Sequence, residues 1–535
     1  MSRKITALLM AGVLLCGCTG CNGGEEPASG QNEPLTVNEV SVAEGLSPVA
    51  ESTENRVFYE IFVGSFADSD GDGTGDLRGI IQRFDYLNDG DPCSGLSLGV
   101  EGIWLSPVFL SPSYHKYDVE DYYTIDPTFG TTEDLQELIS LCHERDVKLI
   151  LDLPINHTSD KNEWFVKFCE AHRADDTASP WYNWYSYGDS VSADGRVFGQ
   201  ISGAEEFYEC NFSNDMPELD FGNPEVVGAV TDVAAHYLDM GVDGFRFDAA
   251  KYIFFGEEQN NVQFWEQYLG SLREKYDGMF SVAEVWAHDS IIQPYLSATT
   301  CFSFGSSQLS GQIAITAKGG DVDFYTAYVE EYLRMTGENS TIAQFIANHD
   351  MDRAAGFLPV SGGEMAMAAS LYLLSPGTPF IYYGEEIGMK GSRGSADTDA
   401  NRRLAMLWGE GNIACDPVGA TYSTDKQING SVAEQRLDEN SLYSHYKRLL
   451  MARRAYPEIA DGTYTALEFP DAKAGGFISE LNGSRVMVLH NTTKEAVTLD
   501  IATYAMKEVV STAGAGAVLQ NGRVTIEGQT TVILK

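Results

Sequence analysis

Basic residues are scarce in this chain of 535 residues. Lys and Arg total 35 against 78 Asp and Glu, which gives a formal net charge of -43 at pH 7. Such a chain repels the phosphate backbone of nucleic acids, so nucleic acid is not expected as a partner. A neutral ligand meets no such repulsion. The 26 Phe, 27 Tyr and 7 Trp residues supply apolar faces on which a neutral ring can lie.

Paired cysteines are also lacking in the body of the chain. The Cys-x-x-Cys spacing of a structural zinc site occurs only near the N-terminus, at Cys18 and Cys21. The sequence therefore predicts no zinc site and does not indicate which cysteines, if any, form a disulfide. The remaining cysteines after the leader are scattered, at Cys93, Cys142, Cys169, Cys210, Cys301 and Cys415.

The N-terminus is typical of an exported protein. Two basic residues precede an apolar run over residues 5–15, which is too short for a permanent membrane span. We interpret residues 1–17 as a signal peptide. The run Leu15-Cys16-Gly17-Cys18 resembles a bacterial lipobox, and this resemblance implies a lipid on the Cys18 thiol and a cell-envelope lipoprotein facing outside the cytoplasm. An ordinary cleaved signal peptide is the alternative.

The segment after the leader has few large apolar residues. Gly, Glu, Pro, Ser and Asn dominate up to about residue 55, and such a composition cannot offset the entropy cost of ordering the chain. We therefore predict that residues 18–54 form a flexible tether between the membrane and the folded part.

Residues 55–455 contain eight short apolar runs separated by helical stretches such as 132–145 and 226–240. This alternation is typical of parallel βα units and predicts a (β/α)8 TIM barrel of the α/β class. A doubly wound open sheet is the competing interpretation, which strand number does not exclude. The predicted strands are 57–62, 102–105, 148–153, 244–247, 280–283, 301–304, 343–347 and 380–383.

Two further regions depart from the βα pattern. Residues 157–219, after the third predicted strand, are too many for an ordinary loop and are rich in Trp, Tyr, Gly and Asp, so we predict a small inserted subdomain. Residues 456–535 contain short alternating segments with Gly and Asn turns. They predict a C-terminal antiparallel β-sandwich.

Acidic and imidazole groups follow four of the predicted strands. They stand in the segments 152–157, 246–248, 284–286 and 348–350. The carboxyl ends of barrel strands meet at one rim, so these groups should converge on one pocket. Each taken alone could be a helix cap or a structural hydrogen-bonding group. Their agreement at four strand ends favours a functional site.

These segments resemble the signature regions of the α-amylase family, glycoside hydrolase family 13. DLPINH (152–157), GFRFDAAKY (244–252), EVW (284–286) and FIANHD (345–350) stand in the family's order, with MPELDF (216–221) resembling a fifth segment. The resemblance extends over about residues 55–535. Within the family, the chain resembles bacterial lipoprotein α-amylases near the oligo-1,6-glucosidase and neopullulanase groups.

The resemblance implies a retaining double displacement by three carboxyl groups. Asp248 would be the nucleophile and Glu284 the general acid and base, which requires a raised pKa and a carboxyl separation of about 5 Å. Asp350 would stabilise the oxocarbenium-like transition state. Arg246 lies two residues before Asp248, on the same strand face, and can pair with its carboxylate. The substrate-binding residues implied are Tyr117, His157, Arg246, Lys251, His349 and Arg403.

An acidic run after the first predicted strand indicates a calcium site. Carboxylates alternate with glycines, as in loops that wrap a hard cation, and the family carries Ca2+ in its first βα loop. A solvated acidic turn is the alternative. The expected ligands are Asp68, Asp70, Asp72, Thr74 and Asp76.

The resemblance implies hydrolysis of α-1,4-glucosidic bonds in starch and maltooligosaccharides, because Ala249 follows the nucleophile as in family members with that preference. A neopullulanase, a cyclomaltodextrinase or a 4-α-glucanotransferase is the nearest alternative. A non-catalytic glucan-binding lipoprotein is the alternative from another class. We expect a monomer whose partners are α-glucan and, through the lipid, the membrane.

Overall fold

The computed structural model describes residues 39–188, 195–396, 398–470 and 473–535. The predicted signal peptide and lipidation site Cys18 lie outside these ranges. In the described ranges, no helix combines the length and the apolar character needed to cross a membrane.

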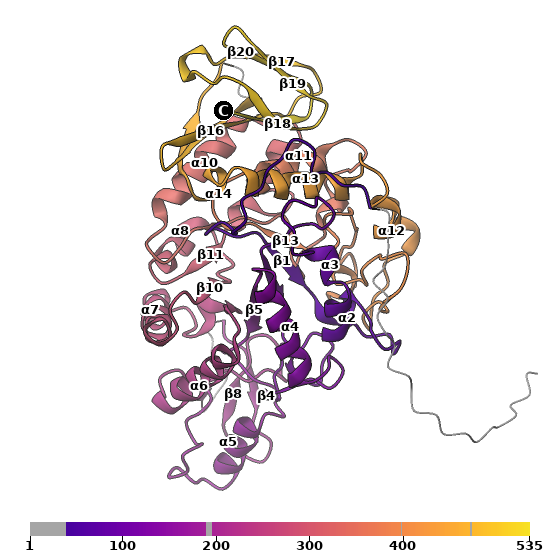
Figure 1. The fold of residues 1–535 in the computed structure, drawn as a ribbon. Helices are drawn as coiled ribbons and strands as arrows, with labels where there is room; N and C mark the ends of the chain where they lie inside the picture. The colour runs from indigo at the N-terminus through magenta and orange to yellow at the C-terminus, as the bar shows by residue number, and fades with distance from the viewer. Residues whose placement is uncertain (1–38, 189–194, 397, 471–472) are drawn as a thin grey trace, which may run out of the picture. The chain divides into compact units, whose positions relative to one another are not determined.

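Eight parallel strands form the centre of the molecule (Figure 1). Each strand pairs with its neighbours in chain order, and the backbone N–H of Phe380 donates to the carbonyl of Gln344 at 2.9 Å, which joins the last strand to the seventh. The predicted TIM barrel is confirmed and the open sheet is excluded. The strands are β1 (Phe58–Ile61), β2 (Gly102–Leu105), β5 (Lys148–Leu153), β9 (Gly244–Phe247), β10 (Phe280–Ala283), β11 (Thr300–Phe302), β12 (Ile342–Ala343) and β13 (Phe380–Tyr382).

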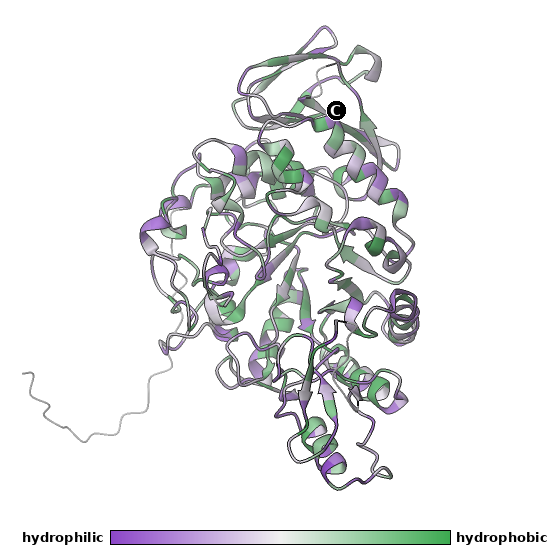
Figure 2. Ribbon diagram, turned by 180° about the vertical axis from the view of Figure 1, so that it is seen from behind, coloured by the Kyte–Doolittle hydropathy of each residue, from purple (hydrophilic) through white to green (hydrophobic). Residues whose placement is uncertain are grey.

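The barrel interior is filled by large side chains from alternating strand positions. The rings of Phe58 and Phe280 stack with centroids 4.9 Å apart, and Trp104, Ile150 and Val282 pack in the same cluster. Figure 2 shows hydrophobic residues along the strands, whereas the surrounding helices carry both hydrophobic and hydrophilic residues. This pattern is the one that strands buried on both faces and amphipathic helices require.

Helices follow the strands and cover the barrel. Their first and last residues carry ordinary capping signals. A reciprocal Thr131–Asp134 capping box begins α4, and Gly241, with φ 110°, ends α6. The α-helices outside the insertion are α1 (Val63–Phe66), α2 (Leu77–Gln82), α3 (Phe84–Leu87), α4 (Thr132–Glu144), α6 (Pro224–Met240), α7 (Glu258–Lys275), α8 (Asp289–Ile292), α9 (Gln312–Ala317), α10 (Val322–Met335), α11 (Glu364–Leu373), α12 (Val432–Gln435), α13 (Leu442–Ala455) and α14 (Glu458–Asp461).

In its described residues, the insertion after β5 contains one helix and a small antiparallel sheet. The isolated bridges His157↔Glu218 and Tyr185↔Leu219 bring the two ends of this region together beside β5. A separate hairpin, β3 (Phe109–Leu110) with β4 (Asp121–Ile125), precedes α4. The elements of the insertion are α5 (Glu163–Arg173), β6 (Tyr187–Gly188), β7 (Phe198–Gln200) and β8 (Phe207–Glu209).

The C-terminal region consists of two antiparallel sheets, as predicted. Their apolar residues form a separate core that includes Met487, Leu489, Val524 and Val532. The five-stranded sheet contains β14 (Thr463–Leu467), β15 (Ala474–Leu481), β16 (Ser484–Asn491), β21 (Thr530–Leu534) and β18 (Val509–Ala513), and the three-stranded sheet contains β17 (Val497–Asp500), β20 (Arg523–Ile526) and β19 (Ala517–Gln520).

The tether prediction is wrong for residues 39–54, which lie against the barrel. Val42 is 6% exposed, and its backbone N–H donates to the carbonyl of Gly95 at 3.2 Å. Further along, the N–H of Val49 donates to the carbonyl of Arg454. Composition missed this segment because its own backbone groups supply many of its bonds, both to backbone carbonyls and to barrel side chains such as Asp146 and Glu101.

Candidate active site

Arg246 is the centre of a buried group of three carboxyl groups. It lies within β9, and its side chain is 0% exposed. One terminal nitrogen lies 2.7 Å from Asp152 Oδ1 and 2.6 Å from Asp248 Oδ1, and the other lies 2.9 Å from Glu284 Oε2. Residues from the carboxyl ends of β5, β9 and β10 therefore meet at one guanidinium group, which offsets part of their desolvation cost.

Glu284 is held as a weak acid. It follows β10, and Oε2 accepts the backbone N–H of Ala249 at 3.1 Å. Ala249 has φ 44°, an uncommon backbone conformation for a residue with a side chain. Burial, which outweighs the opposing effect of Arg246, raises the pKa of Glu284 to about 7, and the charges of Asp248 and Asp350 add to the rise. The carboxyl group can therefore both give and take a proton near neutral pH.

A tyrosine connects this group to a second cluster. Tyr117, between β3 and β4, donates its hydroxyl hydrogen to Asp152 Oδ2 at 2.7 Å. The Tyr117 hydroxyl oxygen also lies 2.5 Å from His349 Nε2. The rings of Tyr117 and His349 are nearly parallel, with an interplanar angle of 9°. Burial raises the pKa of Asp152 to about 6 although Arg246 opposes the rise.

His349 and Asp350 lie in the loop after β12. His349 is fully buried, with Nδ1 2.6 Å from Glu60 Oε1 and Nε2 3.0 Å from Asp350 Oδ2. Burial alone would lower the pKa of this imidazole, but the charges of Asp350 and Glu60 raise it to about 10. His349 is therefore a cation at neutral pH.

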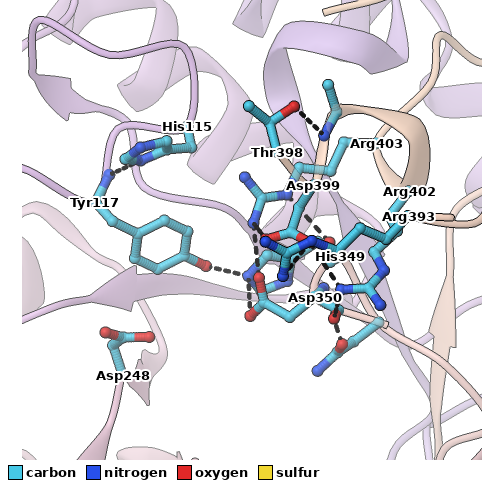
Figure 3. A network of polar contacts seen from close by, with 12 residues as sticks. His115, Tyr117, Asp248, His349, Asp350, Arg393, Thr398, Asp399, Arg402 and Arg403 are labelled. Atoms are coloured by element: carbon cyan, nitrogen blue, oxygen red, sulfur yellow. Dashed lines mark hydrogen bonds and ion pairs between the residues drawn. The ribbon is translucent and has the colours of Figure 1, made fainter. Parts of the chain in front are cut away.

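Asp350 is flanked by cations on both sides (Figure 3). Arg403, in the long segment after β13, lies 2.6 Å from Asp350 Oδ1, opposite His349. Burial would raise the pKa of Asp350, but His349 and Arg403 hold it well below its usual range. Arg402 donates to the backbone carbonyl of Asp350 at 2.7 Å and pairs with Asp399 at 2.7 Å. Asp350 is thus a permanent anion with one quarter of its side chain exposed, 26%.

Two predicted substrate-binding residues lie beside this network. His157 follows β5 and is buried, with Nε2 3.1 Å from the backbone carbonyl of Tyr117. Lys251 lies in the short 3-10 helix η1 (Ala250–Tyr252) and donates to the carbonyl of Trp286 at 2.9 Å. Trp286 is 47% exposed and its ring stacks on Phe304. Lys251 therefore links the loops that follow β9 and β10.

The acidic loop after β1 brings three of its carboxylates together. Asp68, Asp70 and Asp76 each offer an oxygen within 4.8 Å of the others. Asp72 lies outside this group, and its carboxylate accepts the backbone N–H of Thr74 at 2.7 Å. Backbone N–H groups also bond Asp68 and Asp76, but hard oxygen donors at this spacing fit a Ca2+ ion.

Comparison with known proteins identifies the scaffold. Residues 60–462 match the family described as the α-amylase catalytic domain. This chain belongs to the α-amylase family. Alpha-amylase 3 of Dictyoglomus thermophilum is 35% identical over 82% of this chain and 85% of its own length. A 4-alpha-glucanotransferase of Thermotoga maritima is 32% identical over 72% of this chain and 84% of its own length.

The structure of Eubacterium rectale Amy13B resembles this α-amylase family member with a TM-score of 0.85 and 30% identity, covering 92% of this chain and 97% of that chain. The chain is therefore a glycoside hydrolase-type enzyme of the α-amylase family, and the alternative of a non-catalytic glucan-binding lipoprotein is wrong.

Within this α-amylase family site, sequence reasoning missed several residues. Asp152 was seen only as a strand end, although it joins Arg246 to Tyr117. Glu60 carried a signal, a charge within the apolar run 57–62, but its partner lies 289 residues away. Asp399 and Arg402 had no sequence signal, because their segment has no periodic pattern.

Proposed function

We propose that this enzyme is an endo-acting α-amylase that cleaves α-1,4-glucosidic bonds of starch and maltooligosaccharides with retention of anomeric configuration. The observation that carries the proposal is the shared pairing of Asp248 and Glu284 with the Arg246 guanidinium. This contact keeps two carboxyl groups from different strands close together, as a double displacement requires. The alanine after Asp248 and the amylase relative support the α-1,4 preference.

In the first step, a carboxylate oxygen of Asp248 forms a bond to the anomeric carbon while the bond to the glycosidic oxygen breaks. Glu284 gives its proton to that departing oxygen, and the shortened glucan leaves. In the second step, the ionised Glu284 takes a proton from water, whose oxygen attacks the anomeric carbon and releases Asp248. Asp350, as a permanent anion, stabilises the positive charge that develops on the sugar ring in both steps.

The remaining polar residues position the sugar. Tyr117 offers a ring face at the reaction centre. His157 Nε2 donates to the Tyr117 carbonyl, which leaves Nδ1 to accept from a sugar hydroxyl, and His349 holds Tyr117 and Asp350 in place. Arg403 orients Asp350 rather than the sugar, because its guanidinium is already paired with that carboxylate. Lys251 lies beyond Glu284, on the side where the leaving glucan would bind.

The test compares soluble starch, maltoheptaose, pullulan and cyclodextrin as substrates, following product length and anomeric form. Early release of α-anomeric maltooligosaccharides from starch is the expected result. An Asp248→Asn variant should bind glucan but lose turnover by at least about a thousandfold. Normal turnover in that variant would remove Asp248 from the mechanism, and initial release of β-anomers would exclude retention.

A second candidate is 4-α-glucanotransfer, favoured by the relative from Thermotoga maritima. It uses the same three carboxyl groups but a sugar hydroxyl, instead of water, attacks the glycosyl-enzyme. Incubation with maltotriose separates the two activities. Hydrolysis yields one new reducing end per bond broken, whereas transfer yields longer oligosaccharides with a constant number of reducing ends. Preference for pullulan or cyclodextrin would indicate a neopullulanase or cyclomaltodextrinase.

We propose that Ca2+ binds the loop after β1. The ion would be held by Asp68, Asp70 and Asp76, with Thr74 as a further predicted ligand and with Asp72 accepting the Thr74 backbone N–H. It would supply positive charge that ties the loop together, and it takes no part in the reaction. Isothermal titration of chelator-treated protein with CaCl2 tests this proposal, and absence of binding at millimolar Ca2+ counts against it.

We also propose that the enzyme is exported and anchored through a lipid on Cys18, with the leader 1–17 removed. The lipobox-like run 15–18 supports this proposal. Labelled palmitate should enter the wild-type protein expressed in a bacterial host and should be absent from a Cys18→Ala variant. Equal labelling of both proteins would exclude this anchoring site.

A further inference from the structure

Glu60 is a buried charge within the otherwise apolar strand β1. It is 2% exposed, and its Oε1 contacts both the backbone and the ring of His349. The backbone N–H of His349 donates to this oxygen at 3.3 Å, and the ring nitrogen Nδ1 lies 2.6 Å from it. A carboxylate is seldom buried in a barrel strand without a partner, and here the partner is the histidine beside Asp350.

The hydrogen bonds around His349 require hydrogens on both ring nitrogens. Nδ1 donates to Glu60. Nε2 faces the hydroxyl oxygen of Tyr117 at 2.5 Å and Asp350 Oδ2 at 3.0 Å. Tyr117 has one hydroxyl hydrogen, which it donates to Asp152, so its oxygen can only accept from Nε2. A ring that donates from both nitrogens is an imidazolium cation.

The charges in this network explain why the cation is needed. The contacts described above link five carboxyl groups, Glu60, Asp152, Asp248, Glu284 and Asp350, to only two arginines, Arg246 and Arg403. A neutral His349 would leave Asp350 with one cation instead of two. The groups that face the ring are Glu60 from β1, Asp350 from its own loop, Tyr117 from the loop before β4, and the aromatic rings of Trp104 and Phe62.

We infer that Glu60 is a positioning residue that keeps His349 doubly protonated, with Nε2–H shared between the Tyr117 oxygen and Asp350. The inference rests on the proposed function for its consequence in catalysis, but the protonation of the ring can be measured without substrate. The pKa of His349, raised to about 10 by Asp350 and Glu60 against the effect of burial, agrees with this arrangement. Glu60 itself touches no reacting atom.

The direct test is histidine NMR of the intact protein. The protein carries nine histidines, so the His349 signal is assigned by its loss in a His349→Gln variant. We expect the wild-type ring to stay protonated at pH 8.5. In Glu60→Gln, loss of a neighbouring opposite charge should lower the pKa of His349 by about 1–3 units. A neutral wild-type ring at pH 8.5, or an unchanged pKa in Glu60→Gln, would overturn the inference.

Two further variants separate charge from packing. Glu60→Asp keeps the charge and should keep the His349 pKa within about one unit of wild type. Glu101→Gln is the matched control, because Glu101 is also buried but precedes β2 at the other end of the barrel, where it bonds Thr53. It should leave the His349 signal and the activity unchanged. If Glu60→Gln does not fold, Glu60→Asp and the wild-type titration still decide, since a neutral ring in either overturns the inference.

The kinetic consequence is a change in the pH profile. In wild type, only Glu284 should ionise in the alkaline limb of kcat/KM, so log(kcat/KM) falls with slope -1. In Glu60→Gln, His349 should lose its proton in the same limb and steepen the slope toward -2, with kcat at pH 7 lowered at least about tenfold. A parallel downward shift without a change of slope would indicate a merely structural role. If the wild-type protein did not cleave starch but its His349 titrated as expected by NMR, only the proposed function would be contradicted.

Discussion

The active site and the loop after β1 are both acidic, but the fold stabilises them in different ways. In the active site, carboxyl groups meet fixed cations, with Arg246 contacting Asp152, Asp248 and Glu284. In the loop, Asp68 and Asp76 accept backbone N–H groups, and within the described residues neither forms an ion pair with Lys or Arg. The first cluster is balanced by cations of the chain itself, whereas in the second the proposed Ca2+ would supply the balancing charge.

Replacing Arg246 with Met should give the largest effect. The change leaves three buried carboxyl groups without their shared cation, and breaking such contacts costs about 3–5 kcal/mol. Activity should fall by at least about 10⁴-fold, because Asp248 and Glu284 lose the group that orients both. Chemical denaturation and starch turnover measure the two effects.

Arg453→Met is the control for the Arg246 variant. Arg453 is equally buried, but it donates to backbone carbonyls, including that of Leu373 at 2.9 Å, and lies away from the active site. Its loss should lower stability while each folded molecule keeps normal turnover. Near-normal turnover in Arg246→Met would show that the shared guanidinium is not needed for catalysis.

The pH dependence of the active site should follow Glu284. Burial raises its pKa to about 7, and the proposed acid must hold its proton when the glycosidic oxygen leaves. Activity is therefore present below pH 7 and should fall about tenfold per pH unit above it. Initial rates on maltoheptaose from pH 5 to pH 9 measure this limb. The residual activity of a Glu284→Gln variant should no longer show this alkaline fall. A flat wild-type profile up to pH 9 would contradict the assignment of Glu284 as the proton donor.

Chelation should affect the loop and not the active-site cluster. Removing Ca2+ present at 100 times its Kd would lower the free energy of unfolding by about 2.7 kcal/mol. We expect EDTA to lower the melting temperature of wild type, and an unchanged melting curve in excess EDTA would contradict the metal proposal.

Two single substitutions place the ion within the loop. Asp70 is exposed, and among the described contacts its carboxylate accepts one backbone N–H, from Asp72 at 3.1 Å, so Asp70→Asn should disturb the loop least while removing a ligand. It should abolish most of the EDTA effect. Asp72→Asn is the matched control and should keep that effect, because Asp72 lies outside the carboxylate group. Equal loss in both variants would extend the site to Asp72.

The two clusters also differ in how far sequence predicts them. The barrel strands 102–105, 148–153, 244–247 and 280–283 were predicted with their observed bounds, because their buried runs are local signals. Strand β12 is shorter than the predicted 343–347, since the apolar run continues into the loop. The acidic loop after β1 could be predicted as a candidate metal site, because its carboxylates lie within one short segment of the chain.

The contacts of the active site were less predictable, since they join distant segments. Glu60 meets His349, and Arg403 meets Asp350, only after the barrel closes. Sequence gives the residue types at strand ends but not which cation lies beside which carboxylate. Residues 39–54 were missed for a related reason, because their backbone groups bond distant barrel residues such as Asp146 and Glu101, which composition does not reveal.

Lys251 should show the smallest effect, and it marks the edge of the active-site cluster. Unlike Arg246, it pairs with a backbone carbonyl, that of Trp286, and it is only partly buried. Lys251→Ala should therefore lower the free energy of unfolding by no more than about 1 kcal/mol. Because Lys251 lies on the proposed leaving-group side, its loss should raise KM for long glucans a few-fold and leave kcat nearly unchanged. Lys251→Met should show the same change in KM and kcat as Lys251→Ala. A large fall in kcat with unchanged KM would instead place this cation among the groups that stabilise the transition state, because only such groups lower kcat without weakening substrate binding.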